Sequence, residues 1–408
     1  MKSELWIANR LYFAQKGEGG RRSRPAVRVA LAGIVVGVMV MLLTVCVVVG
    51  FKDTVTEKVA GFGAHIQVIN FDNNNTYEMQ PIVVSDSLME VLRAFPHVAE
   101  VHPFLTKPGI VKTGEAFEGI VLKGTDYWDY FADNLQEGRL PEKQNEVLVS
   151  REQAQALRLA VGDGLLSYFM DEQVRVRKFV VSGIYGTGFA EFDKLFVLGM
   201  PEVVRRLNQW EDDQVSGVEI LLDDISRLEE VADEVYFATV NHLDEEGYNV
   251  YYVQTLQQLN PQVFAWLDLL DMNVVVIIVL MLCVSGFTIV SGLIILILDS
   301  VQLIGVLKAL GACDGYVRRI FIAQAGMLIG KGMLWGNVLG LGIAAVQYFT
   351  HWLPLEASSY YVNYVPMAFP WGWIALLNAG ILAVSLLVML APSAIITRIS
   401  PSKVMHFE

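Results

Sequence analysis

Long apolar runs alternate with polar stretches along this chain, and the spacing of the two predicts its main elements. Four runs are long enough to be membrane helices, because about 20 apolar residues cross roughly 30 Å of hydrocarbon. We place these helices at residues 29–51, 272–298, 320–349 and 371–397. The pattern therefore predicts an α/β membrane protein with four transmembrane helices and a large α+β extracytoplasmic domain between helices 1 and 2.

The segment between the first two apolar runs, residues 52–268, shows strand and helix periodicity in turn. Two β-α-β pieces are expected at its ends, residues 64–123 and 215–253. The strands and helices of these pieces are expected at 64–70, 85–95, 98–105, 109–112, 119–123, 215–222, 226–241 and 248–253. We expect the two pieces to pack as one sheet with helices on one face, and residues 125–200 to form an inserted strand-rich subdomain. A helix over 255–271 should run into the second span.

The positions of lysine and arginine indicate the orientation of the chain in the membrane, because these residues concentrate in cytoplasmic loops. Seven precede the first span, and more lie in the loop after the second span and in the tail, whereas residues 351–369 have none. Both termini of this multi-pass chain are therefore expected in the cytoplasm, with the chain in the inner membrane. The remaining segments are an interfacial helix and elbow (1–28), a cytoplasmic coupling loop (299–319), a short periplasmic loop capping the membrane interface (350–370) and a cytoplasmic tail (398–408).

The composition agrees with this layout and limits the kinds of site that the chain can contain. The chain is 54% hydrophobic, with a net charge of −13 and an acidic outer region that suits a solvated exported surface. Its three cysteines are Cys46, Cys283 and Cys313, so residues 52–268 hold no disulfide and must rely on their core. No cysteine or histidine spacing predicts a metal, and we expect no cofactor and no nucleic-acid partner.

Motifs for nucleotide or hydrolytic chemistry are missing from the sequence. The string GMLIGKG (326–332) has the wrong spacing for a phosphate-binding loop and lies in an apolar run. The chain is therefore expected to be no enzyme, and any work that it does must be supplied by a partner chain. Lys331 is the one basic residue in that run; it either extends toward the cytoplasmic headgroups or pairs with Asp299.

The segment QLIGVLKALGACDGYVRRIF (302–321) joins the second and third spans. Leu303, Val306, Leu307 and Leu310 repeat with helical spacing, and Gly311 offers a break. Such a helix either sits in a cleft of a soluble partner or touches lipid alone. We take the first as the coupling site, with ten residues: Leu303, Ile304, Gly305, Val306, Leu307, Lys308, Ala309, Leu310, Gly311 and Ala312.

On these residues the chain resembles ABC-transporter permeases of the lipoprotein-releasing type, in the superfamily of the macrolide-efflux and cell-division permeases. The motif IGxLxALGA followed by a basic pair and Ile-Phe matches residues 304–312 and 318–321. The stretch from Gly50-Phe51 to His65-Ile66 is similar to the releasing branch in particular, as is the proline-containing basic tail (392–407).

The resemblance implies a dimer with a second copy or paralogue, two cytoplasmic ATPase subunits, and lipoprotein cargo that enters a cavity between spans one and two. Closure of the outer domains would then push the cargo toward a periplasmic carrier. Candidate cavity residues lie on the outer halves of the two spans: Val40, Leu43, Val47, Val274, Ile277, Ile278 and Met281. The family's carrier-binding hook is replaced here by a short turn at 171–173, which leaves open whether this chain binds the carrier.

Three other readings compete with lipoprotein release. An efflux permease of the macrolide type usually carries a fused ATPase domain, which this sequence does not contain. A non-transporting mechanotransmitter would move the outer domain to activate a wall hydrolase. A membrane sensor should have a cytoplasmic output domain, but the tail is short.

Overall fold

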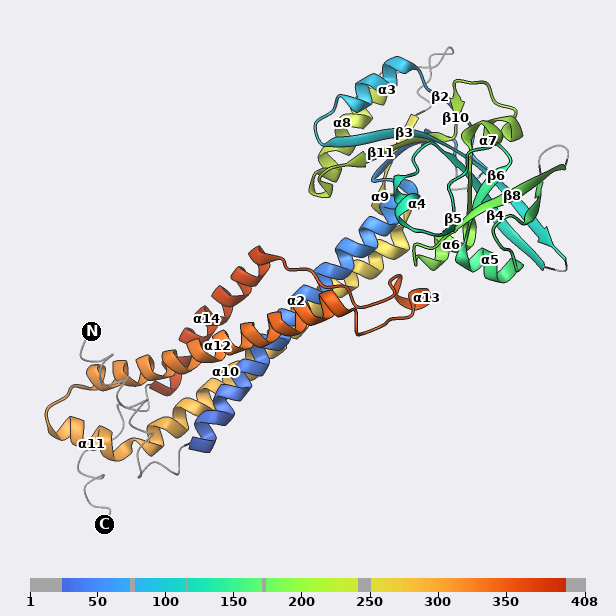
Figure 1. Cartoon of the computed structure of the whole chain (residues 1–408). Coiled ribbons are helices and arrows are strands. Elements are labelled where there is room, and N and C mark those ends of the chain that lie inside the picture. Colours follow the sequence, from blue (N-terminus) through green and yellow to red (C-terminus); the bar gives the residue numbers. More distant parts are fainter. Residues whose placement is uncertain (1–23, 74–77, 115, 171–173, 241–250, 394–408) are drawn as a thin grey trace. The chain divides into compact units, whose positions relative to one another are not determined.

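The computed structural model describes residues 24–73, 78–114, 116–170, 174–240 and 251–393, which divide into two compact units. The helical unit takes in residues 24–52, 267–353 and 365–393, and the α/β unit takes in 53–266 and 354–364 (Figure 1). The expected interfacial helix, the cytoplasmic tail and the turn at 171–173 lie outside the described residues.

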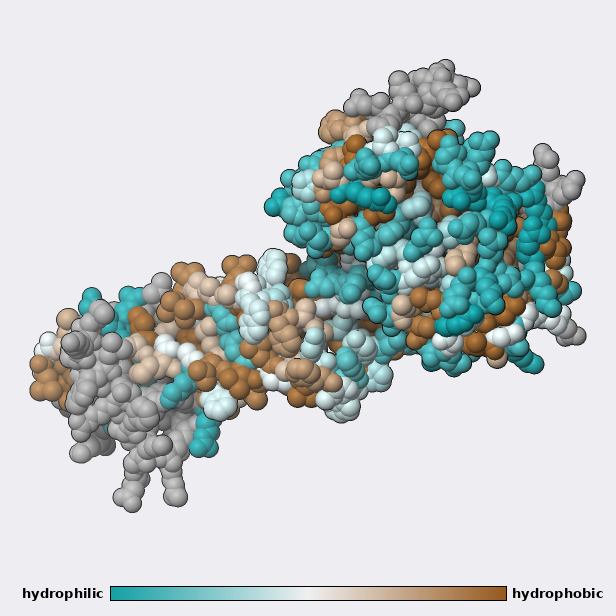
Figure 2. Space-filling view, turned by 45° about the horizontal axis from the view of Figure 1, so that its top comes forward, coloured by the Kyte–Doolittle hydropathy of each residue, from teal (hydrophilic) through white to brown (hydrophobic). Residues whose placement is uncertain are grey.

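Four long helices and one short helix form the helical unit. They are α2 (Arg24–Gly63), α10 (Pro261–Asp299), α11 (Val301–Ala309), α12 (Asp314–Thr350) and α14 (Trp371–Ser393). Within the described chain, α2, α10, α12 and α14 are long and apolar enough to cross a membrane. Apolar side chains cover much of this unit's visible surface, whereas the surface of the α/β unit is mainly hydrophilic (Figure 2). Lys331 is exposed on α12, and the Asp299 side chain lies outside the description.

Glycines on α12 let α2 approach it closely. A Cβ atom added at Gly336 would lie 2.7 Å from the Cβ of Val38, and equivalent contacts occur one turn to either side. We call Gly332, Gly336 and Gly340 the glycine groove; it receives Ile34, Val38 and Leu42 of α2. Small residues at a four-residue spacing are typical of tightly packed membrane helices.

A second glycine pair, on α2, faces α10. A Cβ atom at Gly33 would lie 2.7 Å from Thr288, and one at Gly37 would meet the Ser285 hydroxyl. α2 is therefore packed between α10 and α12, and a shift of either helix must displace it.

The α/β unit is built on a sheet that contains ten strands of the described chain. Their order is β12-β1-β11-β3-β4-β9-β6-β8-β5, with β7 pairing to β3 and β8. The strands are β1 (Ile66–Asn70), β3 (Val98–Thr113), β4 (Ala116–Thr125), β5 (Leu135–Gly138), β6 (Glu146–Ser150), β7 (Gly164–Phe169), β8 (Arg175–Tyr185), β9 (Phe196–Gly199), β11 (Gly217–Leu222) and β12 (Tyr251–Thr255). A separate pair joins β2 (Ile82–Val83) to β10 (Gln214–Val215).

Short helices cover this sheet and bury its apolar side chains. They are α3 (Asp86–Arg93), α4 (Asp129–Asp133), α5 (Arg151–Leu157), α6 (Ala190–Leu195), α7 (Pro201–Asn208), α8 (Leu228–Val240), α9 (Leu256–Leu259) and α13 (Ala357–Tyr360), with a 3₁₀ turn at Ile225–Arg227. The core is one continuous cluster in which Ile66 and Val218 of the sheet meet Leu88 of α3 and Val235 of α8. Burial of such side chains supplies most of the stability of a domain without disulfides.

The two ends of this segment meet in the sheet, as the sequence predicts. β1 pairs antiparallel with both β11 and β12, and β11 pairs with β3. Three details of the prediction are wrong. The expected strands at 98–105 and 109–112 form one strand, β3, because Pro108 keeps a ladder position opposite Val121. Residues 125–200 do not build a sheet of their own, since β5 to β9 continue the same sheet.

The third difference concerns the approach to the second span, where the sequence predicts one helix over 255–271. The structure has two helices, α9 and α10, with Asn260 between them. Pro261 is the first residue of α10, a position that needs no N–H donor and suits the fixed φ of proline.

Candidate functional site

The turn between α11 and α12 is a rigid corner. α11 ends in a Schellman motif, in which the Gly311 N–H donates to the Lys308 carbonyl and the Ala312 N–H donates to the Leu307 carbonyl, both at 3.0 Å. Gly311 has φ +93°, a conformation that glycine adopts without strain. The break predicted at Gly311 is thus a fixed reversal, and α12 begins three residues later.

Side-chain contacts brace this corner from both sides. The Lys308 ammonium lies 2.8 Å from the Asp314 carboxylate in the first turn of α12. Ile304 is fully buried in one cluster with Val317 and Phe321 of α12. The two helices therefore pack as one piece, and a push on α11 would be transmitted to α12.

The four apolar residues that the sequence places at helical spacing in α11 lie in two different environments. Leu307 packs against the Ile304 cluster, Leu303 is half-buried, and Val306 and Leu310 are 56% and 80% exposed. The buried face is centred on Ile304 and Gly305 rather than on the whole stripe. Val306 and Leu310, one turn apart, form the exposed apolar step of α11, and this step is where a partner could make contact.

The residues expected to line a cargo cavity are mostly half-buried. This holds for Val40, Leu43 and Val47 on α2 and for Val274, Ile278 and Met281 on α10, whereas Ile277 is 37% exposed. Ile278 and Met281 pack against the core of the helical unit. The exposed face of α10 consists of other apolar residues: Val275, Val276, Val279, Leu280, Val284 and Phe287. The periodicity of the sequence could not identify this face, because α10 is apolar on all sides.

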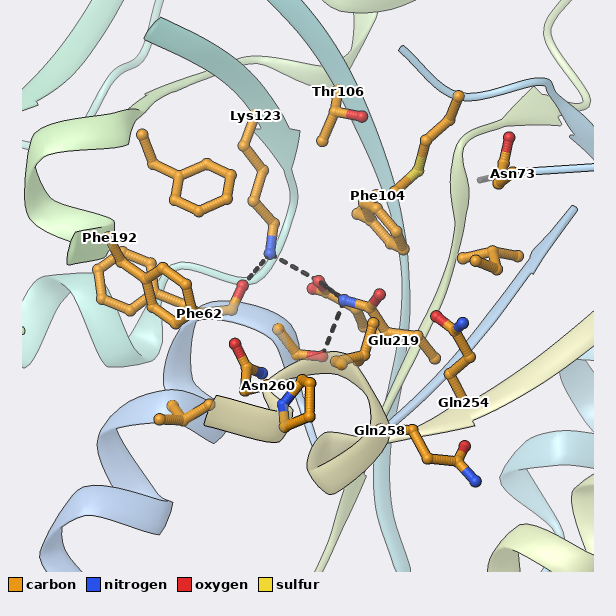
Figure 3. Close-up of a pocket in the computed structure, with 18 residues that line it drawn as sticks. Phe62, Asn73, Phe104, Thr106, Lys123, Phe192, Glu219, Gln254, Gln258 and Asn260 are labelled. Carbon is orange, nitrogen blue, oxygen red and sulfur yellow. Dashed lines mark hydrogen bonds and ion pairs between the residues drawn. The ribbon is translucent and has the colours of Figure 1, made fainter. Parts of the chain in front are cut away.

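A second site, which the sequence analysis missed, lies where α2 ends inside the α/β unit (Figure 3). The last carbonyls of a helix have no partner within the helix. Here the Lys123 ammonium of β4 bonds the Phe62 carbonyl, and the Gln67 amide of β1 donates to the Gly63 carbonyl at 3.0 Å. A positive charge at this end also favours the helix dipole. We call this arrangement the α2 joint.

Glu219 of β11 completes the α2 joint. Its carboxylate accepts from the Lys123 ammonium at 2.6 Å and from the Gln67 amide at 3.1 Å, and the Lys123 and Glu219 side chains are at most 8% exposed. The Lys123 ammonium also lies 5.5 Å from the centre of the Phe104 ring. A buried charge is tolerated only when it is paired and hydrogen-bonded, so the three polar groups depend on one another. The sequence signal that could have revealed this site is the presence of polar residues at inward-facing positions of the predicted strands.

α2 extends beyond residue 51, where the sequence pattern ends the first span. α2 continues to Gly63, and Ala64 takes a left-handed conformation, with φ +59°. Gly61 lies within the helix, where the Tyr130 ring occupies the space that a side chain would need. Burial lowers the pKa of His65, whose ring Nδ1 accepts the Leu222 N–H and joins β1 to the end of β11.

The loop between α12 and α14 contributes residues 354–364 to the α/β unit rather than forming only an interfacial cap. The Tyr361 ring stacks on Phe189 with centroids 4.9 Å apart, and the Lys58 ammonium bonds the Tyr361 carbonyl. Nearby, burial raises the pKa of Asp193 to about 6, although the Thr187 hydroxyl and the Gly188 N–H donate to its carboxylate.

The chain combines four helices that could cross a membrane with a mixed α/β domain, and comparison with known proteins identifies its family. The family model of the MacB-like periplasmic core domain matches residues 29–236, and that of the FtsX-like permease C-terminal region matches residues 275–401. The chain therefore belongs to the MacB-like and FtsX-like permease family.

Individual relatives specify the similarity in more detail. The chain is 23% identical to the lipoprotein-releasing system transmembrane protein LolC of Neisseria meningitidis, over 99% of both chains. It is 23% identical to the corresponding protein LolE of Haemophilus influenzae, over 97% of this chain and 98% of that protein. The crystal structure of the periplasmic region of MacB from Actinobacillus actinomycetemcomitans aligns with a TM-score of 0.34 and 14% identity, over 51% of this chain and 97% of that one.

Proposed function

We propose that this chain is the permease subunit of an ABC transporter that extracts lipid-anchored proteins from the inner membrane and passes them to a periplasmic carrier. The observation that carries the proposal is the full-length likeness to transmembrane proteins of lipoprotein-releasing systems. A separate ATPase subunit supplies the energy, and the permease acts as a dimer with a second copy or a paralogue. Both termini and α11 face the cytoplasm.

The energy requirement fits this task. Removing an acyl chain from a bilayer costs about 0.8 kcal/mol per methylene, so three chains resist extraction by on the order of 30 kcal/mol. Spontaneous escape is negligible at that cost. The permease must therefore offer the chains an apolar path and must receive work from outside.

The helical unit offers a continuous mechanical path for this work. The ATPase contacts the exposed apolar step of α11, Val306 and Leu310, and moves α11 and α12 together because Ile304 and the Lys308–Asp314 pair join them. The glycine groove of α12 holds α2, so α2 moves with α12.

The path then leaves the helical unit through α2 itself. α2 is one unbroken helix from Arg24 to Gly63. In the α2 joint, Lys123 of β4 and Gln67 of β1 bond its last carbonyls, and Glu219 of β11 links these two side chains. A helix held at its end by buried polar bonds transmits a tilt or a rotation to the sheet. In this proposal the α/β domain closes over the cargo when the ATPase closes.

The cargo chains enter along α2 and α10. The candidate residues of both helices, from Val40 to Met281, line this route together with the exposed apolar face of α10 around Val279. A photocrosslinker at position 47 and one at position 279 should both label a lipid-anchored protein, and one at the buried position Ile289 should not. Labelling at neither position would remove the cavity from the proposal.

Reconstitution tests the function as a whole. The permease, its ATPase and a fluorescent lipoprotein are placed in liposomes, and a soluble acceptor is added outside. We expect ATP-dependent transfer of the lipoprotein to the acceptor. ATP hydrolysis with no transfer for any lipoprotein would instead favour a non-transporting mechanotransmitter.

A further inference from the structure

A pocket of about 220 Å³ lies beside the α2 joint, within the α/β unit (Figure 3). Apolar side chains make most of its lining: Val59, Phe62, Phe104, Phe192, Phe196 and Leu259. A cavity of about 150 Å³ is enough to hold one benzene molecule, so this pocket has room for about nine carbon atoms. Gln258 and Leu259 of the lining are at least partly exposed, so a ligand can enter the pocket from outside.

Polar side chains of the lining are bonded to partners within the protein. Lys123 and Glu219 are the charged residues of the lining, and they neutralise each other at 2.6 Å in the α2 joint. Gln258 is also engaged, because its Oε1 accepts the Thr255 N–H at 3.1 Å. The pocket therefore offers a ligand no net charge.

Two polar atoms of lining residues have no hydrogen-bond partner among the described residues, namely Gln254 Oε1 and Asn73 Nδ2. Both atoms are buried below the surface of the pocket, so a ligand in its free volume does not reach them. A polypeptide would bury its N–H and C=O groups here without partners, which costs free energy, whereas a hydrocarbon chain has no polar group to satisfy. Such a chain also gains from the burial of its own apolar surface. The lining thus favours a hydrocarbon chain.

The position of the pocket indicates which hydrocarbon chain reaches it. Val59 and Phe62 of the lining belong to α2, which also carries Val47 of the proposed cargo route. Phe62 lies about 17 Å along the helix axis beyond residue 51, where the sequence pattern ends the first span. A phospholipid whose headgroup stays at the membrane surface keeps its acyl chains within the hydrocarbon core. A lipid that is being lifted out of the bilayer, by contrast, brings its chains past this point.

We propose that this pocket holds the end of an acyl chain of the lipid-anchored cargo while the cargo leaves the membrane. About nine carbons of the chain lie among the side chains of Phe104, Phe192 and Leu259. Burial in the pocket replaces part of the bilayer contact that the chain loses, so the cost of extraction is divided between two steps. The binding of an alkyl chain rests on the pocket alone, whereas its assignment to the cargo rests on the proposed function.

Photolabelling with alkyl alcohols tests the pocket in the full-length protein in lipid nanodiscs, without ATP. The probes are straight-chain alcohols of about six to fourteen carbons, each with a diazirine at its tail, and mass spectrometry locates the labelled residues. Labelling of the pocket lining should rise with chain length to a maximum at about nine carbons and then fall. Labelling of Val279 on the exposed face of α10 should keep rising, because partitioning into a bilayer grows with every methylene. A pocket that is not labelled, or whose labelling shows no maximum, would overturn the proposal.

Substitutions of Leu259 change the size of the pocket and shift this maximum. Leu259→Trp fills the pocket and should remove most of its labelling, whereas Leu259→Ala enlarges it and should move the maximum to chains about three carbons longer. Gln257→Trp adds the same indole ring at an exposed site outside the lining, and it should keep the wild-type profile. A general loss of folding would lower all labelling without moving the maximum. Equal profiles for the wild type and both Leu259 variants would contradict alkyl binding in this pocket.

A labelled lipopeptide identifies the source of the chain. The permease and its ATPase are placed in liposomes of phosphatidylethanolamine and phosphatidylglycerol with either of two probes. One is a triacylated lipopeptide with a diazirine at the end of one acyl chain, and the other is a phospholipid with the same modified chain. With ATP, the lipopeptide should label the pocket and the phospholipid should not.

The remaining outcomes separate the pocket from the proposed function. Equal labelling of the pocket by the phospholipid, or lipopeptide labelling of Val279 without labelling of the pocket, would overturn the assignment to the cargo. Lipopeptide labelling at neither place, with the alcohol profile intact, would count against the proposed function and leave the alkyl-binding pocket standing.

Discussion

Lys308 and Asp314 form a 2.8 Å ion pair across the corner between α11 and α12. The Asp314 side chain is 49% exposed, and partly exposed pairs of this kind contribute at most about 1 kcal/mol. The rigidity of the corner therefore comes mainly from the Schellman hydrogen bonds and from the burial of Ile304. Each of these contacts can be changed separately.

Gly311→Ala should strain the corner without a steric clash. A Cβ atom at Gly311 meets nothing within 4 Å, but φ +93° is unfavourable for any residue with a side chain and costs about 1–2 kcal/mol. We expect the stimulation of ATP hydrolysis by lipoprotein to fall several-fold in proteoliposomes. Gly315→Ala is the matched control, because its Cβ also meets open space at an ordinary φ. Equal stimulation in the two variants would contradict a coupling role for the corner.

Leu310→Asp and Leu307→Asp should distinguish loss of the contact with the ATPase from loss of stability of the helical unit. Leu310 is 80% exposed, so its replacement should abolish co-purification of the ATPase and leave the thermal unfolding temperature nearly unchanged. Leu307 packs against the Ile304 cluster, and a carboxylate there should destabilise the helical unit by about 2–3 kcal/mol. Retained ATPase binding by a folded Leu310→Asp protein would place the contact elsewhere.

Gly336→Ala should loosen the packing of α2 on α12. The added Cβ lies 2.7 Å from the Val38 side chain, and overpacking of this kind costs about 1–3 kcal/mol. Gly330→Ala adds the same methyl group where nothing lies within 4 Å, and should be neutral. Thermal unfolding in detergent checks both. A neutral Gly336→Ala would mean that the glycine groove does not hold α2.

Lys123→Met should disrupt the α2 joint strongly. It leaves the Glu219 carboxylate buried without its cation, a change that typically costs about 3–5 kcal/mol. Adding Glu219→Gln should restore part of this loss, because the buried charge is then removed while the Gln67 amide can still donate to residue 219. Chemical denaturation of the two variants measures the difference. A double variant less stable than Lys123→Met would show that the pair is not the source of the effect.

Asp193 should make stability fall as the pH rises. Its folded pKa of about 6 lies above the ordinary value of 3.8, so the folded state binds the proton more tightly. This contribution is fully present below pH 3.8 and is lost as the pH rises through 6. Relative to Asp193→Asn, the wild type should lose about 2 kcal/mol between pH 4.5 and 7.5. Pulse proteolysis at the two pH values measures it, with Asp133→Asn at the surface as control; parallel pH profiles for wild type and Asp193→Asn would refute the assignment.

Local patterns in the sequence are enough to predict the four apolar helices, the break at Gly311 and the meeting of the two β-α-β pieces. These features depend on local patterns: the length of an apolar run, the conformational freedom of glycine and the period of two along a strand. The likeness of residues 304–312 to a coupling motif was equally local. Such signals can be recognised in the sequence without knowledge of distant contacts.

Contacts between distant parts of the chain determine which helix faces are exposed and which residues pair. The buried pair of Lys123 and Glu219 and the stacking of Tyr361 on Phe189 each join residues far apart in the chain. The face of α10 that remains exposed is also a tertiary outcome, because a helix that is apolar on all sides shows no preferred face in its sequence. Long-range pairing is fixed by the packing of the whole sheet, and no local spacing encodes it.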